Sequence, residues 1–175
     1  DDQKICCAES AYAGKAGDEH GGTRTRAVRV PPERLSGGVE NEALVLQEGN
    51  GFLRTEHRYG DFVLELQARA RQAKDWDSGI FFRCELPPEG KPWPARYQAN
   101  LRQDQEGNVG GLAGAKSQGL AKAGAWNHFK LTVIGDTAKM QINGQPAWEA
   151  KGIEPRDGYI GIQAEVPLGG QFEFK

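Results

Sequence analysis

The sequence predicts an all-β protein: a two-sheet antiparallel β-sandwich of the jelly-roll type, preceded by an irregular N-terminal arm. Short runs of alternating or β-branched residues recur along the chain, and turn residues close each run. The 24 Gly and 9 Pro residues fall between these runs, where tight turns need them. No window combines the 3.6-residue period of a helix with helix caps, which argues against an alternating parallel α/β fold.

The chain divides into an arm at residues 1–38 and a sandwich domain at residues 39–175. Residues 1–25 hold several glycines among small and charged residues, without the period that marks a packed face. From Arg26 onward the strand-like runs begin. The runs predict strands at 26–30, 43–47, 52–57, 61–71, 79–85, 96–102, 127–134, 138–142, 147–150, 159–165 and 171–174.

Two segments show the strand signals most clearly. Along Phe62, Leu64, Leu66 and Ala68 every second residue is apolar, as in a strand with one buried face. After the run at 138–142, Asn143-Gly144 supplies the positive φ angles of a type I′ hairpin. Pro146 then restricts the returning strand to a sheet edge or a late start.

Composition excludes several classes of partner and site. A formal net charge of −2 gives no field that would recruit nucleic acid, and no apolar run is long enough to span a membrane. The cysteines, Cys6, Cys7 and Cys84, are odd in number and lack a Cys-x-x-Cys spacing, so zinc-ribbon and thioredoxin-like sites lack their ligands. We interpret the cysteines as structural residues, or as residues with local chemistry at the chain terminus. A disulfide from Cys84 to one of the other two is an open alternative.

Three groups of motifs cover most of the sandwich region. The first is GFLRTEHRYGDF at 51–62 followed by DSGIFFR at 77–83. The second is YQAN at 97–100 followed by GGL at 110–112. The third comprises WN at 126–127, ING at 142–144, GYIGIQ at 158–163 and FEFK at 172–175.

Together these motifs resemble the 3-keto-disaccharide hydrolase domain family, a group of concanavalin-like sandwiches found mostly in secreted bacterial proteins. The resemblance implies a concanavalin-like fold, a carbohydrate ligand, and a secreted, periplasmic or cell-surface location. The chain has Asp77 where the family commonly has Asn, Asn100 where one branch has Asp, and Ala164-Glu165 where many members have a His. Such departures bear on activity more than on fold.

The acidic residues do not form the strand motif of an ordinary retaining glucanase. That chemistry needs two carboxylates about 5 Å apart, usually from alternate positions of one strand. Glu65 is followed by Leu66 and Gln67, and Glu85 by Leu86 and Pro87, so neither has a second acid two residues later on its strand. Acids from different strands remain an alternative source of a pair.

The resembled family instead implies chemistry on a sugar with a ketone at C3, which acidifies the proton at C2. One base starts elimination of the glycosidic oxygen, and water then adds back. This needs a base, a donor or cation for the enolate oxygen, and polar groups that hold hydroxyls. We expect Glu165 to be the base and Arg83 to stabilise the enolate or bind a hydroxyl. The alternatives are a solvated Glu165 beside a turn and a salt-bridged Arg83.

The remaining polar and aromatic residues near these motifs supply the expected binding groups. Gln98 and Asn100 lie two positions apart on one face of their strand, where their amides could bind sugar hydroxyls. The alternative is that they form an ordinary solvent-exposed face. Trp93, between two prolines, is the stiffest stacking platform, and Trp76 is a second candidate. The expected substrate-binding residues are Asp77, Ser78, Trp93, Tyr97, Gln98, Asn100 and Gln163.

No cofactor is assigned. His20, His57 and His128 are not spaced as metal ligands, so a divalent metal stays open without assigned ligands. Two alternatives to an enzyme are kept. One is a non-catalytic carbohydrate-binding module. The other is a structural domain of a secreted or surface assembly, whose arm at residues 1–38 docks on a protein partner.

Overall fold

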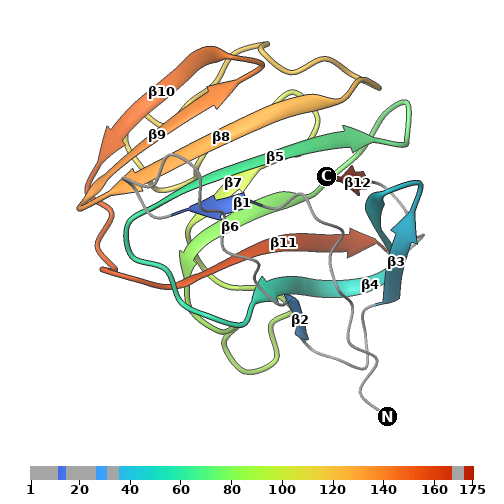
Figure 1. The fold of residues 1–175 in the computed structure, drawn as a ribbon, viewed down its shortest axis with the longest axis horizontal. Helices are drawn as coiled ribbons and strands as arrows, with labels where there is room; N and C mark the ends of the chain where they lie inside the picture. Colours follow the sequence, from blue (N-terminus) through green and yellow to red (C-terminus); the bar gives the residue numbers. More distant parts are fainter. Residues whose placement is uncertain (1–11, 15–26, 31–35, 167–171) are drawn as a thin grey trace.

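The computed structural model describes residues 12–14, 27–30, 36–166 and 172–175, and these residues form strands, turns and bends without a helix. Two antiparallel sheets pack face to face, as the sequence predicted (Figure 1). The long strand β4 (Ala43–Thr55) belongs to both: its first part pairs in one sheet and its second part in the other. No helix that could cross a bilayer occurs among the described residues.

Sheet 1 contains the longer run of neighbouring strands. From one edge to the other its strands are β10 (Gln145–Lys151), β9 (Thr137–Ile142), β8 (Asn127–Ile134), β5 (Phe62–Ala70), β12 (Phe172–Phe174), the first part of β4, and β3 (Ser36–Glu40). The short strand β1 (Tyr12–Gly14) also pairs with β5.

Sheet 2 carries the face on which we place the site. Its strands, in order, are β2 (Ala27–Val30), the second part of β4, β11 (Tyr159–Val166), β6 (Gly79–Cys84) and β7 (Gln98–Asn100). Neighbouring strands are antiparallel throughout, so side chains of the same face line up across the sheet.

Each strand predicted from the sequence has a counterpart in the structure. The predicted strands at 43–47 and 52–57 are one continuous β4, and strands β1 and β3 were not predicted. β3 reads Ser-Gly-Gly-Val-Glu, and adjacent glycines give little strand signal. Strands β1, β2 and the start of β3 lie within the expected arm, whose remaining residues are outside the described ones. The boundary at residue 38 therefore stays a prediction.

The hairpin at Asn143-Gly144 is confirmed. Asn143 has φ 53° and Gly144 has φ 77°, as the type I′ turn between β9 and β10 requires. Pro146 lies on the edge strand β10, where the register shifts before Trp148. A proline without an N–H is tolerated there because the edge and the bulge remove the need for a donor.

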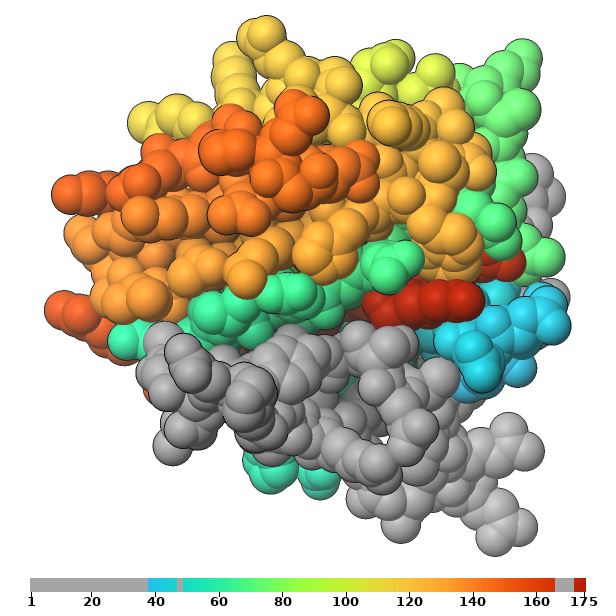
Figure 2. Space-filling model, turned by 45° about the horizontal axis from the view of Figure 1, so that its top comes forward, coloured from blue at the N-terminus to red at the C-terminus, as the bar shows by residue number. Residues whose placement is uncertain are grey.

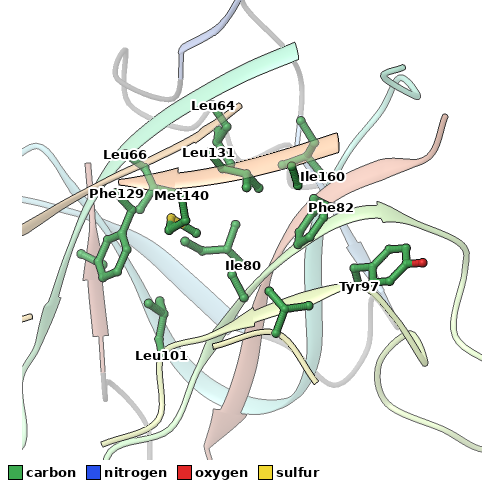
Figure 3. Close-up of a cluster of buried hydrophobic side chains, with 14 of the residues drawn as sticks. Leu64, Leu66, Ile80, Phe82, Tyr97, Leu101, Phe129, Leu131, Met140 and Ile160 are labelled. Atoms are coloured by element: carbon green, nitrogen blue, oxygen red, sulfur yellow. The ribbon is translucent and has the colours of Figure 1, made fainter. Parts of the chain in front are cut away.

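The core fills the space between the sheets (Figure 3). Leu64, Leu66, Phe129, Leu131 and Met140 project into it from sheet 1, and Figure 3 shows them facing Ile80, Phe82, Tyr97, Leu101 and Ile160 from the side of sheet 2. Burial of this apolar area, at about 25 cal/mol per Å², is the main force that holds the two sheets together.

The outer face of sheet 1 is a wet face with cross-strand ion pairs. Strands β10, β9, β8 and β5 run side by side across it (Figure 2). Lys130 pairs with Glu65 at 2.7 Å and Lys139 with Glu149 at 3.1 Å. Exposed ion pairs such as these contribute little to stability, so we interpret this face as an ordinary solvated surface.

The outer face of sheet 2 is different, because part of it is apolar. Phe52, Phe81 and Cys84 form a second buried cluster, against which Trp93 and Tyr159 pack. The Cys84 thiol is free and donates to the Tyr159 carbonyl at 3.4 Å, and burial raises its pKa to about 12. A thiol in this state is unreactive. Cys6 and Cys7 lie outside the described residues.

Candidate functional site

Three polar side chains form a hydrogen-bonded line across the outer face of sheet 2. Ile162 and Ala164 of β11 point into the core, so Gln163 and Glu165 point outward. Gln98 of β7 donates from its amide nitrogen to the Gln163 side-chain oxygen. The Gln163 amide nitrogen in turn donates to a Glu165 carboxylate oxygen at 2.7 Å. Gln163 therefore holds the Glu165 carboxylate in one orientation, and Gln98 in turn holds Gln163.

A glycine makes this line possible. Gly79 of β6 is paired with Asn100 of β7, and the Gln98 side chain lies directly over it. Any side chain at position 79 would collide with the Gln98 amide. The glycine of the DSGIFFR motif thus gives Gln98 the space to reach Gln163 across β6.

Two further charged groups lie beside Glu165. Burial raises the pKa of Glu165, and the negative charge of Asp77 raises it further, against the opposing effects of the Gln163 hydrogen bond and Arg102. Burial also raises the pKa of Asp77, while Arg102 opposes that shift. The Arg102 Nε lies 3.9 Å from an Asp77 carboxylate oxygen. Two carboxylates from different elements and one guanidinium therefore share this end of the face.

Asn100 fixes the turn that presents Arg102. Its side-chain oxygen accepts from the Arg102 backbone N–H at 2.8 Å, and its amide nitrogen donates to the Gln105 side-chain oxygen at 3.3 Å. Asn100 thus positions the turn after β7. Asp77 and Arg102 also line an open depression of about 440 Å³ beside this turn.

The structure brings most of the predicted site residues together. Asp77, Gln98, Asn100, Gln163 and Glu165 lie on or at the end of the outer face of sheet 2. Gln163 is only 4% exposed, so its visible role is to orient Glu165. Trp93 is partly buried against the Phe52 and Phe81 cluster of the same face.

Arg83 does not join this group, which corrects the expectation that it acts on substrate. Its side chain is 1% exposed, and it donates to the carbonyls of Gly60, Gly135 and Pro155 and to the Asp61 carboxylate. Its backbone has φ 43°, at the end of β6. A guanidinium whose donors are engaged in this way ties three loops together and has no face left for a ligand.

Two other predicted binding residues are also structural. Ser78 is buried, and its hydroxyl donates to the Gln163 backbone carbonyl at 2.8 Å. Tyr97 lies in the core, stacked on Phe82, and its hydroxyl donates to the Gly152 carbonyl at 3.2 Å. Trp76, expected as a stacking candidate, is a core residue as well. The period-2 rule places Tyr97 on the face opposite Gln98, which was the missed signal.

Arg102 is the group that sequence reasoning missed. It follows the YQAN motif closely, but the strand was predicted to extend to residue 102, which gave no reason to single out this side chain. In the structure β7 ends at Asn100, and the turn that follows carries Arg102 to Asp77.

Metal ligands do not assemble in the described part of the chain. No group of three or more His, Cys, Asp or Glu side chains there is arranged to hold an ion. His57 and His128 are therefore not placed in a metal cluster, and His20 lies outside the described residues.

The chain belongs to the 3-keto-alpha-glucoside-1,2-lyase-like domain family, whose model matches residues 12–175. The match begins within the expected arm, ahead of the predicted domain boundary. None of the curated proteins matches the sequence closely enough to count as a relative.

Solved structures with the same fold include proteins linked to carbohydrates. A proposed glycosyl hydrolase of Parabacteroides distasonis is 16% identical, with a TM-score of 0.58 over 82% of this chain and 90% of its own. The carbohydrate-binding module CBM66 of Bacillus subtilis is 15% identical, with a TM-score of 0.59 over 85% and 89%. A Bacillus subtilis protein with a galectin-like fold is 10% identical, with a TM-score of 0.53 over 85% and 87%. At these identities the likeness shows the fold alone.

Proposed function

We propose that this domain cleaves 3-keto-glycosides by base-initiated elimination followed by hydration, on the outer face of sheet 2. One observation carries the proposal: a carboxylate with a raised pKa, Glu165, is held by Gln163 and lies beside Asp77 and Arg102. Perturbed carboxylates that share a site with a cation are typical of catalytic centres. The family to which the chain belongs supplies the substrate class.

In this reaction Glu165 is the base. It takes the C2 proton, which the C3 ketone acidifies, and the C–H electron pair forms the C1=C2 bond as the C1–O glycosidic bond breaks. The departing oxygen takes up a proton from solvent and leaves as the free alcohol, and Glu165 gives the proton it removed to solvent. Water then adds across the double bond, with hydroxyl to C1 and a proton to C2. A base whose pKa lies closer to the working pH is better suited to this step.

Arg102 stabilises the negative charge that develops on the C3 oxygen. Such charge is stabilised by a donor or cation fixed near the reacting group. Arg102 is suited to this role because its side chain is 61% exposed and its guanidinium lies at the same end of the face as Glu165. Gln163, through its bond to the carboxylate, is a positioning residue, and Gln98 holds Gln163.

The test is the release of keto sugar from a 3-keto-glucoside, measured with and without chelator. We expect turnover by the unsubstituted protein and a fall of about 10²–10⁴-fold in Glu165→Gln, the usual contribution of a general base. Glu149→Gln is the matched control, because Glu149 lies on sheet 1 and pairs only with Lys139 among the described residues. Equal rates in the two variants would refute the assignment of Glu165. Equal rates with and without chelator would support a base that acts without a metal.

A second candidate is a carbohydrate-binding module without catalysis. The observation that favours it is that the half-buried Gln98 amide and the partly buried Trp93 share the outer face of sheet 2. An amide and an aromatic ring on one sheet face suit sugar recognition. Binding of the keto sugar without any turnover would select this function over the enzyme.

A further inference from the structure

The residue directly opposite Glu165 on the neighbouring strand β4 is Asn50. The pairing of β4 with β11 runs through this point without a shift in register. Opposed residues of an antiparallel pair point to the same face of the sheet, with Cβ atoms about 4.5–5.5 Å apart. Asn50 therefore lies on the outer face of sheet 2, next to the proposed base.

The Asn50 side chain is open to a ligand. Asn50 is exposed, whereas the next pair of residues on the same face of the two strands, Phe52 and Gln163, is buried. No hydrogen bond joins the Asn50 amide to another of the described residues. Its amide nitrogen can therefore donate to a molecule that reaches Glu165.

Asn50 and Arg102 lie on opposite sides of Glu165. Strand β11, which carries Glu165, lies between β4 and β6 in sheet 2 (Figure 1). Asn50 is on the β4 side. Asp77 precedes β6, and Arg102, which follows β7, lies 3.9 Å from Asp77 on the other side. The order across the sheet is therefore Asn50, Glu165, Arg102.

This order matches three consecutive carbons of a sugar ring. In the proposed reaction Glu165 takes the proton from C2, and Arg102 faces the oxygen on C3. The other ring neighbour of C2 is C1, which carries the glycosidic oxygen. A ring that is oriented by Glu165 and Arg102 therefore directs its glycosidic oxygen toward β4 and Asn50.

We infer that Asn50 is a catalytic residue that donates a hydrogen bond to the glycosidic oxygen as this oxygen departs. The role rests on the proposed function. As the C1–O bond breaks, its electron pair goes to the oxygen, and the Asn50 N–H stabilises the negative charge that develops there. Solvent then supplies the proton, and Asn50 itself transfers none.

The test compares two leaving groups. The kcat/KM is measured on 4-nitrophenyl 3-keto-glucoside, whose leaving group is a stable anion, and on methyl 3-keto-glucoside, whose leaving group is a strongly basic one. In Asn50→Ala we expect kcat/KM to fall about tenfold or more for the methyl glycoside, the effect of one hydrogen bond to a charged group. The value for the 4-nitrophenyl glycoside should stay nearly unchanged. Gln141→Ala removes an exposed amide from β9 in sheet 1 and should leave both values unchanged.

Asn50→Asp tests the position of residue 50 without reference to the leaving group. A carboxylate opposite Glu165 adds its charge to that of Asp77, against the opposing charge of Arg102, and so raises the pKa of Glu165 further. The acidic limb of kcat/KM on the 4-nitrophenyl glycoside should shift to higher pH by about half a pH unit, as for one charge about 6 Å away in water. An unshifted limb would mean that residue 50 does not face Glu165, which overturns the inference.

The outcomes separate this inference from the proposed function. If the unsubstituted protein cleaves both glycosides and Asn50→Ala lowers the two kcat/KM values equally, or lowers neither, the role of Asn50 is overturned and the proposed reaction stands. If the unsubstituted protein cleaves neither glycoside, the proposed reaction fails, and the role of Asn50 fails with it.

Discussion

Arg83 and Arg102 carry the same charged group in opposite settings. Arg83 is 1% exposed and bound by the carbonyls of three loops and by Asp61. Arg102 is 61% exposed and has one described ion-pair partner, Asp77, at 3.9 Å. Burial lowers the pKa of Arg83, opposed by Asp61. Arg102 instead alters the pKa values of two carboxylates.

The difference is that between a group that holds the fold together and one that is free for the role we propose. A buried charge must be paired and fully hydrogen-bonded, which leaves it unable to respond to a ligand. An exposed cation beside desolvated carboxylates has donors to spare and alters the chemistry of its neighbours. The same substitution at the two arginines should therefore damage different properties.

Arg83→Met should cause the largest loss of stability. Three carbonyl oxygens lose their donor, and lost bonds of this kind cost about 1–3 kcal/mol each when the group stays buried. We expect the free energy of unfolding to fall by about 3 kcal/mol, measured by urea denaturation. A loss below about 1 kcal/mol would show that the stability of the protein does not depend on the bonds from Arg83 to these three loops.

Arg102→Met should reverse this pattern. An exposed side chain with a long ion pair contributes little to stability, so the free energy of unfolding should change by less than about 0.5 kcal/mol. The kcat/KM on a 3-keto-glucoside should fall about tenfold or more as enolate stabilisation is lost. Unchanged kcat/KM would remove Arg102 from the proposed reaction, whatever the stability.

Asp77→Asn tests the coupling between the carboxylates beside Arg102. The Asp77 charge raises the pKa of Glu165, so its removal lowers that pKa. Because the base acts when ionised, kcat/KM falls as the pH drops through this pKa, and the acidic limb should shift to lower pH in the variant. Asp136→Asn, on the exposed turn between β8 and β9, should leave the profile in place. A shift in both variants or in neither would contradict the coupling.

Glu165→Gln should have the smallest effect on stability, with the opposite sign to Arg83→Met. The pKa of Glu165 is raised in the folded state, so the folded protein holds its proton more tightly than the unfolded chain. Stability therefore falls as the pH rises from the unfolded pKa through the folded one. Thermal unfolding should show Glu165→Gln slightly more stable than the unsubstituted protein at pH 7 and equal to it below about pH 4. A variant less stable at pH 7 would contradict the burial of this charge.

The fold could be predicted because its signals are local. Alternation along β5 and the Asn143-Gly144 turn each specify an element within a few residues. Strand β3 was missed because its two glycines pack no side chains. The merging of two predicted strands into β4 was missed because it depends on which sheets the two halves join.

The site could be predicted only in part, because its geometry depends on contacts between strands. Gln163 and Glu165 share a face by the period-2 rule, and the sequence was enough to pair them. The bond from Gln98 to Gln163 depends on β7, β6 and β11 lying in register over Gly79. The burial of the Arg83 side chain depends on hydrogen bonds to three loops that are far apart in the sequence, and no local sequence pattern predicts such contacts.

The central claim is that Glu165 removes the C2 proton, and isotope exchange tests it most directly. The reaction is run in D₂O with a 3-keto-glycoside protonated at C2, and the keto sugar is analysed by NMR as it forms, against a sample without protein. We predict deuterium at C2 of the product at the rate of cleavage, with both lost in Glu165→Gln and retained in Glu149→Gln. Cleavage that leaves the C2 proton in place would contradict the account, because it would show direct displacement at C1.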